Sequence, residues 1–417
     1  MVRRSSLRGI MGLWIGLAAA TTALADDLKP IPLKSRITSV QPMTGIVLWT
    51  TNGAVDTSPV QLEFSYIRYD QIVREKGKYD WSKLEKILDG VKSRKHQAVI
   101  RFHDTYVGQT SGVPDYIRKL PDYRGVVALS EKKKTGFPDW SHPELRRFLL
   151  EFVDRFAEKY DEDPRLAFLE VGFGLWSEYH IYDGPMKLGQ TFPSLEFQVE
   201  FAERLNTRLH RTPWMVSVDA ASEWSPFASN KKVLALPFGE FDDSFNHARH
   251  GEVNEPNWNA LGRDRWKVGP AGGEFSFYEP KDQSQALAPK GPHGTSFEDH
   301  AAKFHITFMI GDAQPQHQKP ERIREASQAC GYRFQATEFK ASASRSVATF
   351  RNAGIAPIYH DAYPAVNGVR AKESLKGLLP GESRTFQVAA GGATPMLTIE
   401  SDRLVPGQRI EFEADLP

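Results

Sequence analysis

Two glutamates follow apolar segments of the chain and could carry out acid–base or nucleophilic chemistry. Glu178 comes after the apolar run 166–173, inside the segment GLWSEYH (174–180), and Glu274 follows two glycines near the end of the run 267–275. They are 96 positions apart (274 − 178), and the small residues beside them leave room for a ligand. Two opposed carboxyl groups can hydrolyse a glycosidic bond: one protonates the leaving oxygen, and the other attacks the anomeric carbon or activates water. The pattern predicts that Glu178 and Glu274 form such a catalytic pair.

The two roles need different protonation states. The pKa of the acid must be raised while its partner stays ionised. The aromatic side chains of Trp176 and Tyr179 could raise the pKa of Glu178 by excluding water around it. Glu240 and Asp243, which follow a predicted sixth strand, are the reserve candidates for the second carboxylate.

Further candidates for substrate contact lie near predicted strand ends. Arg68 and Arg101 could hold the nucleophile ionised through a bidentate pair, or could form structural ion pairs. His103 and Asp104 could hydrogen-bond a substrate, although His103 could also be a core residue. Tryptophans beside polar or small residues could stack on sugar rings, and we expect two or three of them to do so. The predicted substrate-binding residues are Trp176, Tyr179, His180, Arg101, His103, Asp104, Trp49, Arg68 and Asp243.

The elements that must position these residues alternate between strands and helices. Helical spacing of apolar residues is clear in the segments after Ser82 and Ser141, each with a glutamate three residues on, and again over 196–209 and 320–329. Alternation of this kind indicates parallel β/α units. An open, doubly wound sheet usually carries a nucleotide-binding glycine loop, and the sequence has none. We therefore predict a (β/α)8 barrel. Its eight predicted strands are 45–49, 62–69, 98–103, 166–173, 214–218, 233–236, 267–275 and 305–310.

The pattern changes after Cys330. Residues 331–417 contain short strand-like runs and turns without helical spacing, and a Pro-Gly turn precedes an aromatic strand at both 380–386 and 406–412. Short strands at regular spacing predict a small β-sandwich. The predicted domains are a signal peptide (1–25), a barrel (26–330) and a sandwich (331–417), for which a structural or accessory role is the simplest expectation.

The first 25 residues have the pattern of a secretory signal peptide. A segment with three arginines precedes the apolar run 10–20 and the motif Ala23-Leu24-Ala25. The apolar run is too short to cross a bilayer, which needs about 20 residues. We therefore expect an exported protein, periplasmic or secreted, with no membrane span.

Charge and cysteine content exclude several classes of function. Removing residues 1–25 changes the formal charge from +1 (53 − 52) to −2 (50 − 52), which gives no electrostatic basis for nucleic-acid binding. Cys330 is the only cysteine, so no internal disulfide is possible. His247 and His250 lie in a polar loop without a metal-binding motif, so we predict no metal site and no cofactor. The oligomeric state is left open.

Several motifs resemble those of clan A glycoside hydrolases. The segment KYDWSKLE (78–85) resembles the opening of these barrels, and GLWSEYH (174–180), GGE (272–274) and GYRF (331–334) resemble bacterial proteins related to β-galactosidases active on small glycans. The resemblance implies a retaining mechanism with Glu178 as acid/base and Glu274 as nucleophile, acting on an oligosaccharide or polysaccharide. Clan A enzymes normally have Asn directly before the acid/base, where this chain has Ser177.

That departure keeps other functions open. A non-catalytic glycan-binding protein on the same barrel would retain the cleft, and an exopolysaccharide-assembly component would have no open cleft at all. Whether Glu178 and Glu274 face one cleft should distinguish the hydrolase, the glycan-binding protein and the assembly component.

Overall fold

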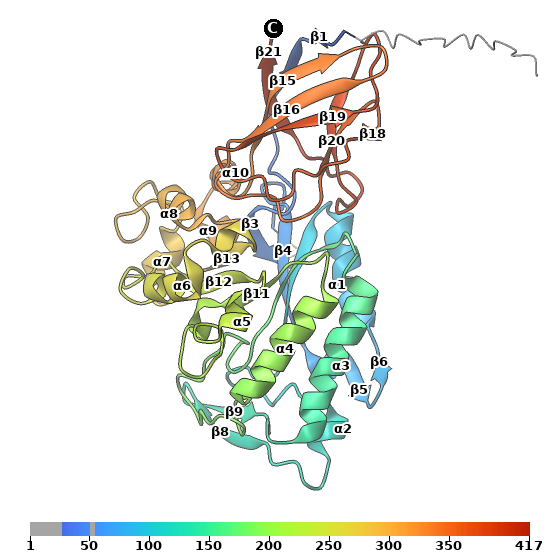
Figure 1. Cartoon of the computed structure of the whole chain (residues 1–417). Coiled ribbons are helices and arrows are strands. Elements are labelled where there is room, and N and C mark those ends of the chain that lie inside the picture. The colour runs from blue at the N-terminus through green and yellow to red at the C-terminus, as the bar shows by residue number, and fades with distance from the viewer. Residues whose placement is uncertain (1–26, 51–54) are drawn as a thin grey trace, which may run out of the picture.

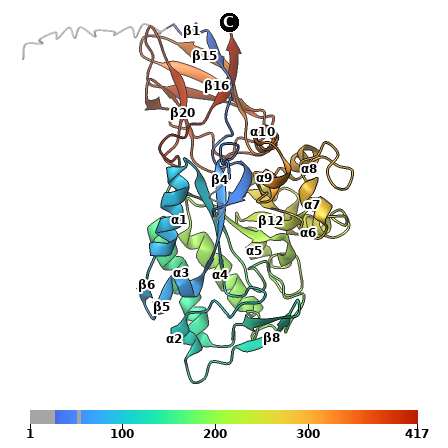
Figure 2. The same ribbon diagram turned by 180° about the vertical axis from the view of Figure 1, so that it is seen from behind.

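The computed structural model describes residues 27–50 and 55–417. The predicted signal peptide, residues 1–25, lies outside the described residues. Within the described ranges, no helix has the length and hydrophobicity that crossing a bilayer requires. Figure 1 shows a barrel surrounded by helices, with a β domain at one end of it, and Figure 2 shows the same arrangement from behind.

The centre of the protein is a closed barrel of eight strands, and each pairs in parallel with its neighbours in the order β10-β11-β12-β13-β14-β3-β4-β7. This confirms the predicted (β/α)8 barrel. The strands are β3 (Gly45–Trp49), β4 (Leu62–Arg68), β7 (Gln97–His103), β10 (Leu166–Glu170), β11 (Trp214–Ser217), β12 (Gly239–Phe245), β13 (Ala271–Phe275) and β14 (Phe308–Ile310).

Helices surround the barrel, and two hairpins lie in the connections between its strands. The longer helices are α1 (Ser82–Ser93), α3 (Pro143–Tyr160), α4 (Leu195–Arg208), α6 (Asn254–Gly262), α8 (Phe297–Phe304) and α10 (Pro320–Gln328). The shorter ones are α2 (Asp115–Arg118), α5 (Lys231–Leu234), α7 (Pro280–Ser284) and α9 (Gln314–His317). The hairpins are β5 (Val73–Glu75) with β6 (Lys78–Tyr79) and β8 (Val126–Ser130) with β9 (Lys133–Phe137).

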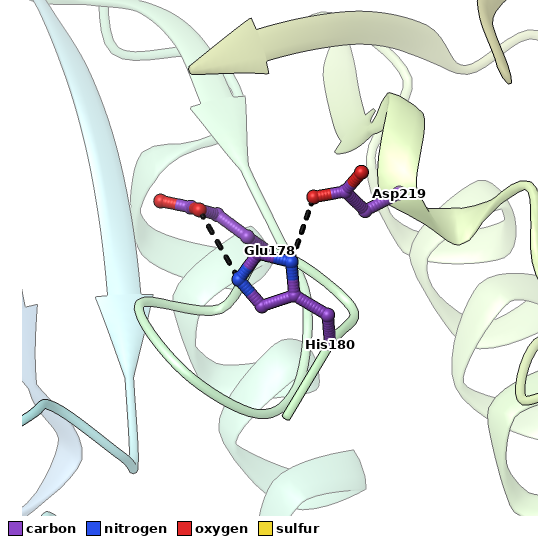
Figure 3. Close-up of side chains that lie close together, drawn as sticks. All are labelled: Glu178, His180 and Asp219. Atoms are coloured by element: carbon purple, nitrogen blue, oxygen red, sulfur yellow. Dashed lines mark ion pairs between the residues drawn. The ribbon is translucent and has the colours of Figure 1, made fainter. Parts of the chain in front are cut away.

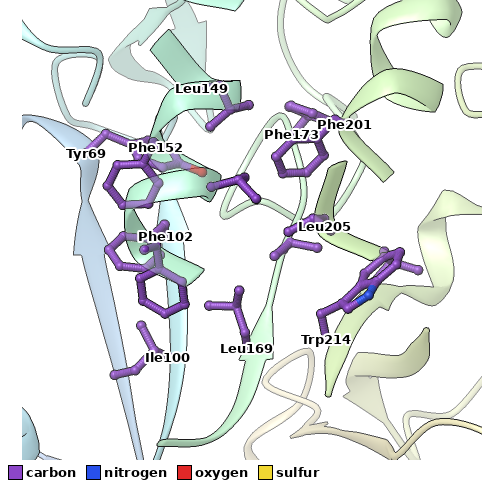
Figure 4. Close-up of a cluster of buried hydrophobic side chains, with 14 of the residues drawn as sticks. Tyr69, Ile100, Phe102, Leu149, Phe152, Leu169, Phe173, Phe201, Leu205 and Trp214 are labelled. Atoms are coloured by element: carbon purple, nitrogen blue, oxygen red, sulfur yellow. The ribbon is translucent and has the colours of Figure 1, made fainter. Parts of the chain in front are cut away.

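A large aromatic cluster fixes α3 and α4 against the barrel (Figure 4). Phe152 of α3 contacts Phe102 of β7 edge to face, with ring centroids 4.8 Å apart. Phe201 of α4 packs on Phe173, just beyond β10, at 5.0 Å. Burying each such side chain contributes about 1.5–3 kcal/mol. The wall beneath the loop that carries Glu178 is therefore firmly packed.

The sequence placed the sixth strand wrongly. Residues 233–236 were predicted to be a strand, but they lie in and just after α5, and the strand is β12. A four-residue apolar run cannot distinguish strand from helix by periodicity, while the acidic residues of β12 conceal a buried strand. Likewise His305, predicted in strand eight, ends α8 in a left-handed conformation with φ 54°.

The C-terminal domain consists of two sheets. The larger sheet holds β1 (Lys29–Pro30), β2 (Leu33–Ser35), β15 (Phe334–Ala341), β16 (Ser346–Asn352), β19 (Ser383–Val388) and β21 (Phe412–Leu416). The smaller holds β17 (Tyr363–Val366), β18 (Val369–Arg370) and β20 (Leu397–Glu400). Residues 29–35, which the sequence grouped with the barrel, thus pair with this domain.

This domain binds the N-terminal ends of the barrel strands. Buried Arg403 donates hydrogen bonds to the carbonyl oxygens of Asp161 and Leu166, and Gln97 donates to the carbonyl oxygen of Arg403. Leu166 and Gln97 are the first residues of β10 and β7. The opposite end of the barrel, where active sites form in this fold, is left uncovered by it.

Candidate active site

A cleft of about 500 Å³ opens at the C-terminal end of the barrel strands. Glu178, on the loop after β10, and Glu274, in β13, both line it. Asp243 of β12 lies between them in chain order and also faces the cleft. Among the predicted substrate contacts, Trp49, Trp176 and His180 are part of the lining. Residues far apart in the sequence thus form one site.

The loop that presents Glu178 has an unusual backbone. Trp176, Ser177 and Tyr179 have φ values of 52°, 62° and 62°, a left-handed conformation that non-glycine residues rarely adopt. A Cβ on Gly172 would lie 1.9 Å from the carbonyl oxygen of Ser177, so only glycine allows this close approach. Such strain persists where the surrounding structure imposes it, commonly at functional sites. Here it points Glu178 toward the cleft.

Ser177 holds this loop to the barrel. Its side chain is fully buried, and its Oγ donates a hydrogen bond of 2.8 Å to the carbonyl oxygen of Phe102 in β7. The residue directly before Glu178 therefore faces the protein interior and not the cleft. In this chain that position has an anchoring role.

Replacing Ser177 with Ala is expected to lower the free energy of unfolding by about 1–3 kcal/mol, because it leaves a buried carbonyl oxygen without its donor. Ser177→Gly is the matched control: it loses the same hydrogen bond but relieves the positive φ, which costs an L-residue about 1–2 kcal/mol. Denaturant unfolding of both variants checks this. An alanine variant as stable as the wild-type chain would contradict the anchoring account.

Arg101 lies beneath the floor of the cleft. Its guanidinium is fully buried and contacts Glu170 at 2.5 Å, Glu178 at 3.1 Å and Asp243 at 2.5 Å. Strand register explains part of this, because Arg101 of β7 pairs with Glu170 of β10 on one side and Tyr66 of β4 on the other. An arginine was predicted to pair with the nucleophile, but Arg101 contacts Glu178, the predicted acid, and forms its barrel-interior ion pair with Glu170.

Burial and mutual repulsion perturb the carboxyl groups around Arg101. Burial raises the pKa of Glu178 well above its usual value, the negative charge of Asp243 raises it further, and Arg101 opposes both. The pKa of Glu274 is also raised well above its usual value, again first by burial and then by Asp243. Burial raises the pKa of Glu170 to about 7, against the lowering effect of Arg101. One guanidinium cannot compensate all these charges, so the cluster retains protons near neutral pH.

His180 connects Glu178 to Asp219 (Figure 3). Its Nδ1 lies 2.7 Å from an Asp219 carboxylate oxygen, and its Nε2 lies 3.6 Å from Oε2 of Glu178. Asp219 fixes the orientation of the imidazole ring, which aims its other nitrogen at the glutamate. Each of these three residues offers one atom that could bind a metal ion, and these atoms lie within 4.8 Å of one another. The same is true of Glu279, Asp282 and His293, so either set could hold a metal ion.

Three predicted contacts lie outside the lining of the cleft. Tyr179 is buried in the aromatic core, edge-on to Phe173 with ring centroids 5.5 Å apart, because the left-handed backbone turns it away from Glu178. Arg68 pairs with Asp70 at 2.6 Å and lines a separate surface pocket. Asp104 is buried and accepts a hydrogen bond from the Thr105 hydroxyl, and burial raises its pKa to about 7.

Two further candidates lie behind the walls of the cleft. His103 is buried, its ring contacts Tyr66 and Tyr106, and burial lowers its pKa to about 3, so it supports the aromatic wall in its neutral form. Glu240 does not line the cleft. It lies in β12 one position before Phe241, which contacts Arg101 inside the barrel, and so points outward. Asp243 is thus the reserve carboxylate that the structure brings to the site.

Sequence reasoning missed several residues of the cleft. Tyr66, Tyr106, Tyr182 and Tyr278 form aromatic walls, and Asp219 lies just beyond β11. Asp219 could have been found by the rule applied to the glutamates, since it follows the apolar segment 214–218. The tyrosines carried no comparable signal, because aromatic residues are common throughout the chain.

Comparisons with known proteins give similarity in structure only. No family model matches the chain, and no curated protein matches it in sequence. The fold is similar to a family 30 subfamily 8 xylanase from Clostridium acetobutylicum (12% identity, TM-score 0.39, covering 86% of this chain and 98% of that one). It is also similar to a family 39 glycoside hydrolase from Bacteroides cellulosilyticus (12%, 0.41, 84% and 81%) and to an α-galactosidase from Lactobacillus brevis (11%, 0.39, 88% and 56%). At these values the chemistry must be argued from the cleft of this chain itself.

Proposed function

We propose that the protein is an exported glycoside hydrolase that cleaves an oligosaccharide or polysaccharide by a retaining mechanism. The observation that supports this most strongly is the cleft, in which Glu178 and Glu274 lie on different β/α units of one barrel and line one cavity. Aromatic side chains flank them, as a sugar-binding site requires.

In this mechanism Glu274 attacks the anomeric carbon as a carboxylate, the form that Arg101 and the indole N–H of Trp49 favour against the pKa-raising effects of burial and Asp243. At the same time Glu178 gives its proton to the leaving oxygen. The glycosyl–Glu274 ester then reacts with a water molecule, from which Glu178 takes a proton, and Glu274 leaves as a carboxylate. Burial and Asp243 keep Glu178 protonated for the first step, since both raise its pKa. Arg101, 3.1 Å from its Oε1, stabilises the carboxylate that exists between the two steps.

The walls of the cleft can bind sugar rings by stacking and hydrogen bonding. Trp49 packs edge-on against Tyr66, with ring centroids 5.5 Å apart and an interplanar angle of 65°, and both line the cleft. Trp176 stacks nearly parallel on Tyr182 at 5.9 Å and forms another wall. Apolar ring faces of this kind bury the C–H surface of a sugar, while the carboxylates accept hydrogen bonds from its hydroxyl groups.

The raised pKa of Glu178 predicts the pH dependence of activity. Glu178 must be protonated to donate, so activity should fall as the pH rises through its pKa and persist well above the usual glutamate value of about 4.3. A pH–rate profile of kcat/KM checks this. A profile whose alkaline limb falls near the usual glutamate value would contradict the assignment of Glu178 as the acid.

The experiment that tests the function is reducing-end release from a broad glycan panel. The protein from residue 26 onward would be compared with Glu178→Gln, Glu274→Gln and the exposed control Glu321→Gln in α10. Release that is lost in the first two variants and kept in the control supports the proposal and identifies the substrate. Release that survives in Glu274→Gln would mean that Asp243, and not Glu274, is the nucleophile. Glycan binding without any release would support the alternative of a binding protein.

Export is part of the proposal and has its own test. We expect processing after Ala25 when the full chain is expressed with its own N-terminus in a bacterial host, which N-terminal sequencing of the extracytoplasmic fraction would detect. Unprocessed protein that remains in the cytoplasm would contradict this part.

A further inference from the structure

The cleft is lined by many more acidic than basic side chains. Seven of its lining residues are aspartate or glutamate, and within the described ranges none is lysine or arginine. Arg101 lies beneath the floor, but it is already shared among Glu170, Glu178 and Asp243. Asp219, whose side chain is 36% exposed, and Glu131 at the rim extend the negative charge toward the solvent. A cavity lined by one sign of charge concentrates ligands of the opposite sign.

One buried acceptor in the cleft also lacks a donor. Asp243 is 9% exposed at its side chain, and its Oδ2 binds Arg101, but its Oδ1 is buried without a hydrogen-bond donor among the described residues. The neighbouring Glu178 can donate a hydrogen bond to Asp243 only when the Glu178 carboxyl group is protonated. A buried acceptor without a donor is destabilising, so a ligand that donates a hydrogen bond here gains affinity.

The aromatic residues of the cleft fit a cation as well. Tyr66, Tyr106 and Trp176 line the cleft together with the carboxyl groups, and Tyr106 is edge-on to both of the others at 5.9 and 6.1 Å. The faces of aromatic rings attract cations electrostatically. An ammonium group donates three hydrogen bonds and accepts none, which matches a cleft of carboxylate acceptors.

We infer that the cleft binds a glycan carrying free amino groups, with a sugar ammonium group placed against Asp243 and Asp219. The inference rests on the proposed function for the site but names its substrate class. A uronic-acid glycan would meet repulsion from the same carboxylates, and an N-acetylated one would lose the charge and leave Asp243 Oδ1 with fewer donors. Selection among glycans therefore depends on the amine.

Binding of matched oligosaccharides tests the inference. Oligomers of glucosamine and of galactosamine, each in free-amine and in N-acetylated form, would be titrated into the full mature chain in a Glu178→Gln background that prevents turnover. Calorimetry is done at a pH at which the amines are protonated. We expect the free-amine form of at least one oligomer to bind about tenfold more tightly, with a preference that weakens as salt is added.

Variants assign the preference to the cleft. In the same background, Asp219→Asn and Asp243→Asn should each reduce the preference to about threefold or less, while Glu321→Gln, which removes an equal charge outside the cleft, should leave it unchanged. Asp219→Asn serves if Asp243→Asn fails to fold, because Asp219 does not contact Arg101.

The outcomes separate this inference from the proposed function. Equal binding of both forms, tighter binding of the N-acetylated form, or no binding of any amine-bearing oligomer would overturn the inference. Release of reducing ends from a neutral glycan that depends on Glu178 and Glu274 would then still support the hydrolase. Amine-selective binding without release by the wild-type chain would support the inference and contradict the hydrolase.

Discussion

Replacing Glu178 with Gln is expected to lower kcat for a glycoside with an alkyl or sugar leaving group by about 10²–10⁴-fold. Glutamine keeps the size of the side chain but can neither donate the proton to the leaving oxygen nor accept one from water. With an aryl leaving group that departs as a stable phenolate, the first step should be nearly as fast as in the wild type. The rate of leaving-group release in the first turnover, measured on a matched pair of alkyl and aryl glycosides of the substrate sugar, gives this contrast.

The leaving-group contrast is what distinguishes an acid from a residue that merely shapes the cleft. Asp219→Asn is the informative comparison, because Asp219 orients His180 and gives no proton to the leaving group in this mechanism. It should slow both substrates by a similar and smaller factor. If Glu178→Gln slowed the release of the alkyl and aryl groups equally, Glu178 would not be the acid.

Replacing Arg101 with Met is expected to lower the free energy of unfolding by about 3–5 kcal/mol at neutral pH. The guanidinium is fully buried and is the cation that Glu170, Glu178 and Asp243 share, so its removal leaves buried carboxylates without a partner. Methionine fills much of the volume, which separates the loss of charge from the loss of packing. Denaturant unfolding monitored by tryptophan fluorescence would give the difference.

The loss should depend on pH in a defined direction. Arg101 lowers the pKa of both Glu170 and Glu178, so the wild-type folded state binds fewer protons than the variant. The destabilisation should therefore grow as the pH rises through about 7, where Glu170 ionises in the wild type, and shrink below it. Arg155→Met, which removes an exposed arginine paired with Glu158, should cost less than about 1 kcal/mol at any pH. A loss for Arg101→Met that does not change between pH 5 and pH 8 would contradict this account.

The barrel could be predicted from sequence because seven of its strands are apolar runs between helical patterns. β12 was the exception, since the segment GEFDDSF contains three acidic residues in seven positions. Glu240 is buried behind the barrel wall, and Asp243 binds Arg101 at the cleft floor. A strand whose polar residues are paired through tertiary contacts has no local signal, and the short apolar run of α5 offered a false one.

The site could be predicted in part, as far as strand ends determine it. Glu178 and Glu274 share a cleft because both follow predicted strands of one barrel. The side on which Tyr179 lies could not be predicted, because the left-handed backbone of the loop reverses the alternation that an extended segment would have. Ser177 could not be recognised as an anchor either, because its partner is a backbone carbonyl group of β7, 75 positions away.

The most direct test of the mechanism is the intact mass of Glu178→Gln after brief reaction with an aryl glycoside of the substrate sugar. Attack by Glu274 needs no acid with this leaving group, but hydrolysis of the glycosyl–Glu274 ester needs Glu178 as a base. A covalent intermediate should therefore accumulate in the variant. We predict a mass increase of one glycosyl unit, located by peptide mapping on Glu274. The absence of an adduct while aryl release continues, or an adduct on Asp243, would contradict the assignment of Glu274 as the nucleophile.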